Sequence, residues 1–221
     1  MGESSKSVRQ FSELEWSILK GRIIDIGAGP DPVTPGALGF DKQQGDANKI
    51  TQFQPGSFDC VYSSHCLEHM FDPRTTISNW WDLVKPSGHL FFIVPDEDLY
   101  EQGQFPSVFN NDHKHTFTIS KKKSWSSSSI NVIDLCQSLA DAEIVKLHLN
   151  DSGYDRRIGG HGPKKKSKAI ELARKLYRSL RKRHLIPRLI FVERWFSRTI
   201  GWDQLYGNVL AQIEVILRKK A

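Results

Sequence analysis

A glycine turn in the first quarter of the chain is the clearest candidate for binding a small molecule. The stretch IIDIGAGPDP, residues 23–32, is an apolar run that leads into Gly27 and Gly29. Dinucleotide-binding folds use such glycines so that the amino terminus of a helix can meet a pyrophosphate. Here Pro30 and Pro32 follow at once and would interrupt a long helix. The sequence therefore predicts a ligand-binding turn without a phosphate cradle.

Three acidic residues lie near the ends of the apolar runs in this region. Asp25 is inside the first run, Asp41 ends the second, and Asp46 follows shortly afterwards. In open α/β sheets, ligands bind in the crevice outside the carboxyl ends of the strands. Carboxylates at that edge suit a cationic ligand that also carries hydroxyl groups. We therefore expect a positively charged ligand with a sugar-like part.

The stretch NNDHKHTFT contains the candidate catalytic residues. His113 and His115 are two residues apart, so on a strand both side chains would face the same side. A neutral imidazole within hydrogen-bond reach of an alcohol can take its proton during a group transfer. His113 is the leading candidate base. The alternative interpretation is that both histidines tie a loop to the core.

The stretch HCLEHM does not predict a metal site. His65 and His69 are four residues apart, but the zinc motif H-E-x-x-H is absent because the glutamate is Glu68. We expect structural roles for Glu68 and His69 and no bound metal. An alternative metal site, which no spacing requires, would use Asp96, Asp112 and His113.

The elements that must position these residues alternate between strands and helices. Apolar runs bounded by turn residues predict strands at RIIDIG, GALGFD, SFDCVYSS, HLFFIVP, AEIVKLHLN and AQIEVILRK. A helix is expected to begin at Pro73 with Asp72 as its cap. Further helices are expected at residues 131–139 and around Phe11, Leu14 and Ile18. This alternation predicts an α/β fold.

A basic segment separates the last two predicted strands. We interpret residues 155–205 as a helical insertion, because a direct connection would not need so many residues. Residues 156–198 hold fifteen Lys and Arg but only two acids, which accounts for the net charge of +6. One helix would carry an apolar stripe of Ala169, Leu172, Ala173, Leu176 and Leu180. A second would start at Pro187 and carry Phe191, Trp195 and Phe196.

This basic insertion has several interpretations. It could be a solvated helical face, a lid over an acceptor site, or a peripheral contact with an anionic membrane through residues 164–200. Nucleic-acid binding ranks below these, because aromatic residues at helical spacing more often pack in a core than stack on bases. We expect a small-molecule or glycan acceptor to be the main partner.

Four sequence blocks together resemble the class I S-adenosylmethionine-dependent methyltransferases, specifically the broad methyltransferase type 11 group. The blocks are IDIGAGP, GFD, GDANKITQFQPGSFDCVYSSHCLEHMFDP and LVKPSGHLFFIVPD, which occur in order over residues 22–96. The resemblance implies a doubly wound, Rossmann-like sheet that is mostly parallel with an antiparallel last strand. The basic helical insertion would precede that last strand.

The resemblance also implies which residues hold S-adenosylmethionine. Its methionine part would be surrounded by Asp25, Gly27, Ala28 and Gly29, with Ser63 and Ser64 on the methionyl side. Asp41 would hold the ribose hydroxyls, and Asp46 with the Ala47 backbone would read the adenine.

The chain departs from the family pattern in its spacing. Only twelve residues separate Gly29 from Asp41 and only five separate Asp41 from Asp46, whereas a usual member fits a helix in each gap. Both helices are therefore predicted to be reduced to turns.

The implied reaction is methyl transfer from S-adenosylmethionine, with S-adenosylhomocysteine as the product. The shortened loops, PDEDLYE and DHKHTFT resemble bacterial methyltransferases of surface-glycan synthesis. We therefore expect O-methylation of a sugar hydroxyl on a lipid-linked or nucleotide-linked intermediate. The alternatives are a methyltransferase acting on RNA or another small metabolite, and a non-catalytic binding protein that has kept the fold.

Composition is consistent with a single domain over residues 1–221. Hydrophobic residues make up 38% of the chain, and six Trp and twelve Phe can build a substantial core. Neither a membrane-spanning run nor a signal peptide is recognisable, so we expect a cytoplasmic protein that could bind peripherally to the inner face of the membrane. The three cysteines have no metal-like spacing and are expected to be buried free thiols.

Overall fold

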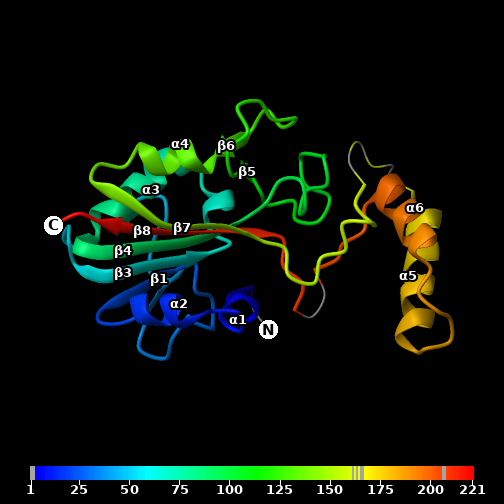
Figure 1. The fold of residues 1–221 in the computed structure, drawn as a ribbon, viewed down its shortest axis with the longest axis horizontal. Helices are drawn as coiled ribbons and strands as arrows, with labels where there is room; N and C mark the ends of the chain where they lie inside the picture. Colours follow the sequence, from blue (N-terminus) through cyan, green and yellow to red (C-terminus); the bar gives the residue numbers. More distant parts are fainter. Residues whose placement is uncertain (1–2, 161, 163, 165–166, 206–207) are drawn as a thin grey trace.

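The computed structural model describes residues 3–160, 162, 164, 167–205 and 208–221. Its centre is a six-stranded sheet with the strand order β2-β1-β3-β4-β8-β7 (Figure 1). The strands are β1 (Ile23–Ile26), β2 (Leu38–Phe40), β3 (Phe58–Ser64), β4 (Val84–Pro95), β7 (Ala142–Asn150) and β8 (Gln212–Lys219). Helices cover both faces, so the predicted doubly wound α/β fold is confirmed.

The direction of the strands also agrees with the prediction. β1 pairs in parallel with β2 and β3, and β3 pairs in parallel with β4. β8 is antiparallel to both of its neighbours, β4 and β7. The last strand is therefore the antiparallel one in an otherwise parallel sheet, and the carboxyl ends of β1, β2 and β3 meet at one edge.

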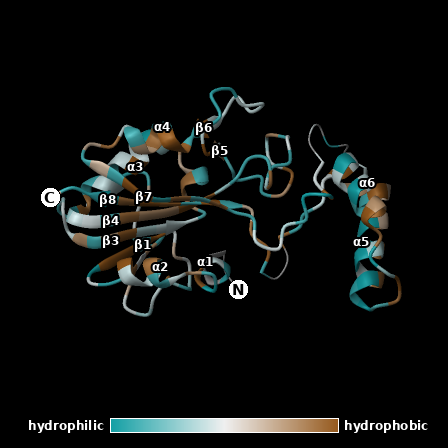
Figure 2. Cartoon of the chain, in the orientation of Figure 1, coloured by the Kyte–Doolittle hydropathy of each residue, from teal (hydrophilic) through white to brown (hydrophobic). Residues whose placement is uncertain are grey.

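Each strand sends alternate side chains to the two faces of the sheet. Ile24 and Ile26 of β1 belong to the larger core cluster, which contains Trp80 and lies under α3 (Pro73–Asp82) and α4 (Val132–Gln137). Ile23 belongs to a second cluster on the opposite face. Both faces are buried, which explains why the central strands are so apolar (Figure 2).

Two short helices, α1 (Glu3–Val8) and α2 (Glu13–Ile18), cover the second face. The predicted amino-terminal helix is shorter than expected, because a capping box of Ser12 and Glu15 starts α2 after Phe11. Phe11 packs instead against Phe91, with ring centroids 5.3 Å apart.

The connections between the first three strands contain no helix. Residues 27–37 and 41–57, all of them described, form turns and irregular structure. Asp72 caps α3 by accepting a hydrogen bond from the Arg74 amide, as predicted. The predicted loss of two helices is confirmed, and the carboxyl edge of β1 and β2 is therefore covered by loops.

A short 3-10 helix and a small second sheet follow, neither of which was predicted. The 3-10 helix η1 (Leu67–His69) comes directly after β3. The second sheet pairs β5 (Thr116–Thr118) in parallel with β6 (Ser129–Asn131), and Phe117 forms a bridge to Asp96 beyond the end of β4. This arrangement fixes the loop that carries the two candidate histidines.

The basic insertion forms two helices, α5 (Lys168–Lys182) and α6 (Ile190–Ile200), at a distance from the sheet (Figure 1). α6 begins three residues after Pro187, where a start was predicted. The helices enclose a small core cluster of Ile158, Tyr177, Phe196 and Trp202. Residues 161, 163, 165 and 166 of the predicted insertion lie outside the described residues.

The predicted apolar stripe of α5 faces away from that cluster. Leu172 and Leu176 are 69% and 59% exposed, whereas Tyr177 on another face of the helix is buried. On α6, Phe191 and Trp195 are 71% and 51% exposed. None of the helices in the described part of the chain combines the length and apolarity that spanning a bilayer requires. The cysteines Cys60, Cys66 and Cys136 are buried free thiols, as expected.

Candidate functional site

A pocket of about 380 Å³ opens at the carboxyl ends of β1 and β2. It is built by the turns after these strands, by the segment after β3 and by the loop around residue 112. Its lining includes Gly27, Asp41, Asp46, Ala47, His65 and His69. Four predicted cofactor residues therefore come together at the crevice where an α/β fold binds its ligand.

The glycine turn forms the floor of this pocket. Gly27 has a positive φ of 81°, and its amide donates a 2.7 Å hydrogen bond to the Phe40 carbonyl. A Cβ atom on Gly27 would lie 2.8 Å from the Cβ of Cys66, so a larger residue does not fit. The turn therefore needs glycine both for its conformation and for the close packing beneath it.

Asp41 joins the end of β2 to the glycine turn. Its Oδ2 accepts a 2.9 Å hydrogen bond from the Gly29 amide, and its Oδ1 accepts one of 2.7 Å from the Lys42 amide. These bonds hold the carboxylate at the pocket wall. Its remaining acceptor capacity is suited to ligand hydroxyl groups.

The shortened connection after β2 brings Asp46 and Ala47 into the same pocket. Asp46 accepts hydrogen bonds from the amide and the side chain of Asn48, which hold the pKa of Asp46 below its usual value. The Ala47 carbonyl accepts a 2.8 Å hydrogen bond from the indole of Trp80 in α3. This end of the pocket is thus fixed although no helix precedes it.

The remaining predicted cofactor residues lie beside the pocket. Asp25 is fully buried, its Oδ2 accepts a 2.6 Å hydrogen bond from the Val33 amide, and its Oδ1 has no hydrogen-bond partner. Burial raises the pKa of Asp25 to about 7. Ala28, Ser63 and Ser64 are also buried, and the Ser63 hydroxyl donates to the Ile26 carbonyl. These four residues and Gly29 do not line the pocket.

The two candidate catalytic histidines lie before β5 and not within a strand. His113 is buried, and its Nδ1 is 2.7 Å from Oε1 of Glu101. His115 is half-buried, and its Nε2 is 3.2 Å from the Phe71 carbonyl. Each ring therefore has its own internal partner, and the expectation that both face one side of a strand is wrong because this segment is not extended in a sheet.

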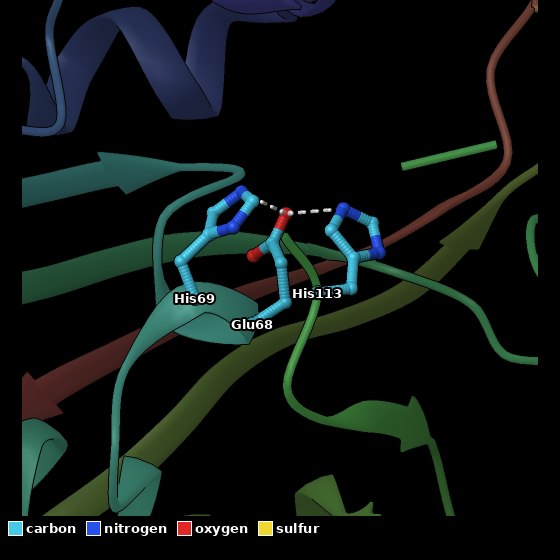
Figure 3. A group of neighbouring side chains, drawn as sticks. All are labelled: Glu68, His69 and His113. Atoms are coloured by element: carbon cyan, nitrogen blue, oxygen red, sulfur yellow. Dashed lines mark ion pairs between the residues drawn. The ribbon is translucent and has the colours of Figure 1, made fainter. Parts of the chain in front are cut away.

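The loop carrying His113 is anchored to η1 through the backbone. The Glu68 carbonyl accepts hydrogen bonds from the amides of Lys114 and His115, at 2.8 and 3.2 Å. This contact brings His113 beside Glu68 and His69 (Figure 3). His65 and His69 line the pocket, although the sequence interpretation treated His69 as structural.

Glu68 is the most deeply buried member of this group. Burial by itself would raise its pKa, but His65, His113 and His69 outweigh that effect and hold the pKa below its usual value. The only signals for this cluster in the sequence were the spacing of HCLEHM and the pair of histidines in DHKH, which lie over forty residues apart.

A family model described as a methyltransferase domain matches residues 25–92. The match runs from Asp25 through the glycine turn and η1 into β4, and so includes the strands and turns that build the pocket. Residues 25–92 are similar to this methyltransferase domain family, over less than half of the chain.

One relative and two solved structures extend this comparison. Ubiquinone biosynthesis O-methyltransferase of Ralstonia nicotianae is 40% identical over 55 residues, which cover 25% of this chain and 23% of that protein. A protein of Bacillus halodurans assigned as a methyltransferase matches over 100% of both chains, with 15% identity and a TM-score of 0.55. A SAM-dependent methyltransferase of Archaeoglobus fulgidus covers 99% of this chain and 95% of its own, with 15% identity and a TM-score of 0.50.

These likenesses establish the methyltransferase fold for the chain. The family and the fold imply S-adenosylmethionine as the cofactor. The pocket fits such a group: Gly27 lets the turn pack closely on Cys66 at the pocket floor, and Asp41 offers a fixed carboxylate. When bound, the cofactor would supply an electrophilic methyl group on a sulfonium.

Proposed function

We propose that this chain transfers a methyl group from S-adenosylmethionine to an oxygen atom of its acceptor. The observation that carries the proposal is the pocket itself, where the methyltransferase domain places Gly27, Asp41, Asp46 and Ala47 around one crevice. In this arrangement Asp41 holds the ribose hydroxyls and the Asp46–Ala47 turn reads the adenine. The buried side chains of Asp25, Ser63 and Ser64 support the part of the pocket that holds the methionine of the cofactor.

Oxygen as the acceptor atom is supported by the partial relative, which is named an O-methyltransferase. Transfer to a hydroxyl is an in-line displacement in which the acceptor oxygen forms a bond to the methyl carbon and loses its proton. A base within hydrogen-bond reach assists that loss. His113 and His115 remain the predicted bases, while His65 and His69 are the histidines that line the pocket.

We propose a sugar hydroxyl of a surface-glycan intermediate as the acceptor. Its support is the pair of shortened connections, which leave the carboxyl edge covered by loops alone, and the exposed apolar and basic face of α5 and α6. A lipid-linked acceptor would lie at an anionic membrane surface, which such a face suits. The alternatives are a different acceptor, either RNA or another small metabolite, and a protein that binds the cofactor without catalysing methyl transfer.

The first test is a calorimetric titration of the purified protein with S-adenosylmethionine. We expect Asp41→Ala to weaken binding by at least about tenfold, because a charge-assisted hydrogen bond is worth about 1.5–3 kcal/mol. Asp82→Ala is the matched control, since Asp82 is an exposed acid at the opposite edge of the sheet, just before β4. Equal affinities in all three proteins would contradict the assignment of Asp41.

Candidate acceptors of each class are then incubated with the protein and labelled S-adenosylmethionine, and the methyl incorporation into each class is compared. Methyl incorporation into sugar nucleotides or lipid-linked sugars supports the proposal. Incorporation into RNA or another metabolite replaces the acceptor but keeps the reaction. Cofactor binding without methylation of any class would indicate a binding protein.

A further inference from the structure

Glu68 lies at the centre of three histidines. Its side chain is fully buried, and neither carboxylate oxygen accepts a hydrogen bond. Oε1 lies 3.9 Å from Nε2 of His113, 4.0 Å from Nε2 of His69 and 3.4 Å from Nδ1 of His65. A buried carboxylate without a hydrogen bond is costly unless a cation compensates it.

The outer nitrogen of each ring meets an acceptor oxygen. Nδ1 of His113 contacts Glu101 at 2.7 Å, and Nδ1 of His69 is 3.1 Å from the Asp112 carbonyl. Nε2 of His65 is 3.1 Å from the side-chain oxygen of Gln212. Because carboxylate, carbonyl and amide oxygens accept hydrogen bonds, each outer nitrogen carries the proton.

In a ring that carries only this one proton, the inner nitrogen presents a lone pair toward Glu68. A nitrogen of His69, a nitrogen of His113 and a carboxylate oxygen of Glu68 lie within 4.8 Å of one another (Figure 3). Such an arrangement repels itself unless a positive charge lies between the groups. Either the rings take up a second proton or the site binds a metal ion.

We propose that Glu68, His69 and His113 bind a divalent transition-metal ion, with Zn²⁺ as the best fit to two imidazoles and one carboxylate. This donor set occurs in catalytic zinc sites that keep a position open for water or substrate. Tetrahedral ligands about 2.1 Å from zinc lie about 3.4 Å from one another. The 3.9 and 4.0 Å separations from Glu68 need to close by about 0.5 Å on binding, and all three ligand atoms already lie within 4.8 Å of one another.

The surrounding groups match those of a metal centre. Metal-bound histidines usually donate their other N–H to a carboxylate or a carbonyl, which fixes the ring and raises its basicity. Glu101 plays that part for His113, and the Asp112 carbonyl does so for His69. Both orienting groups are already in place.

The position of the cluster gives such a metal a role, which rests on the proposed function and in which His113 holds the metal instead of acting as the base. Of the three proposed ligands, His69 lines the cofactor pocket, so an acceptor would reach an open coordination position from the side of His69. Binding of the acceptor hydroxyl to the metal would lower its pKa, and its proton would leave to solvent. The oxygen then bonds to the methyl carbon as the carbon–sulfur bond breaks, releasing S-adenosylhomocysteine.

Metal binding itself is tested without reference to methyl transfer. Protein without a histidine tag is stripped with chelator, and ZnCl₂ is titrated into it by calorimetry. We expect one zinc per chain, and binding at least about tenfold weaker in Glu68→Gln and His69→Gln. Glu101→Gln, which touches no metal, should cost about 10–100-fold in affinity. His115→Gln is the matched control and should bind like the wild type, because its ring contacts Phe71 outside the cluster.

His69 is partly exposed, so His69→Gln is the variant expected to keep its fold, which circular dichroism of the metal-free protein checks. Cobalt substitution adds a second readout, since tetrahedral Co²⁺ gives visible absorption bands that should appear in the wild type and His115→Gln only. Absence of zinc and cobalt binding in the wild type, or equal binding in all variants, would overturn the proposal and assign the cluster to protonated histidines. S-adenosylmethionine titration of the same metal-free protein separates that failure from a failure of the proposed function.

Discussion

Asp25 illustrates how one residue can make stability depend on pH. Its carboxyl group is buried, only one of its oxygens accepts a hydrogen bond, and its pKa is raised from 3.8 to about 7 by burial. Between these two values the folded protein holds a proton that the unfolded chain releases. Stability from this group is therefore fully present below pH 3.8 and falls as the pH rises to about 7, by up to about 1.4 kcal/mol per pH unit.

We predict that Asp25→Asn removes this part of the pH dependence. The melting temperature of the wild type should decline relative to that of the variant as the pH rises from 5 toward about 7, and the two curves should run parallel above it. Thermal unfolding followed by circular dichroism in a series of buffers measures the difference. Parallel curves across the whole range would contradict the raised pKa.

Gly27 is the position where the backbone conformation is expected to affect ligand binding most. Gly27→Ala would place a side chain at φ 81° and 2.8 Å from Cys66. We predict a loss of about 1–3 kcal/mol in unfolding free energy and weaker binding of S-adenosylmethionine. Gly36→Ala is the matched control, because no atom lies within 4 Å of a Cβ built there and its φ is not positive. Denaturant unfolding and calorimetry of the two variants test the difference.

At the scale of elements, the α5–α6 hairpin exposes aromatic and basic side chains on one face. Phe191 and Trp195 are exposed on α6 together with Arg194 and Arg198, which fall on the same side of the helix. Aromatic rings beside basic side chains are typical of helices that lie in the interface of an anionic membrane. Acidic lipid headgroups attract these basic side chains, which favours an anionic membrane over an uncharged partner.

We predict that the protein sediments with vesicles containing phosphatidylglycerol and only weakly with phosphatidylcholine vesicles. Phe191→Ser combined with Trp195→Ser should weaken vesicle binding roughly a hundredfold, since burying part of each ring is worth about 1.4 kcal/mol. Trp16→Ser is the control, because Trp16 is similarly exposed but lies on α2. Added salt should weaken binding. Equal sedimentation of the double variant and the wild type would remove the membrane from consideration.

Elements that depend on neighbours in sequence could be predicted well. The cap at Asp72, the apolar run of β4 and the turns that replace two helices all follow from local residue types. The Glu68–His113 contact could not be predicted, because it depends on how the loop after β4 returns to η1. The exposed stripe of α5 was visible in the sequence, but which side of the helix packs against α6 was not.

At the scale of the whole molecule, two core clusters sandwich the sheet and a third lies within the insertion. The methyltransferase domain thus places its pocket at the carboxyl edge of β1–β3, while the basic residues gather on the separate hairpin (Figure 1). The division of residues 1–221 into one domain with an insertion over 155–205 remains a prediction that suits this arrangement.

The antiparallel strand β8 lies between β4 and β7 and follows β7 by about sixty residues. During synthesis on the ribosome, β4 and β7 must therefore wait, with unpaired edges, until the whole insertion and then β8 have emerged. Exposed strand edges pair readily with other chains, and distant pairings form slowly. The nascent chain would depend on chaperones during this interval, and a stop codon placed anywhere in the insertion would release a product prone to aggregation.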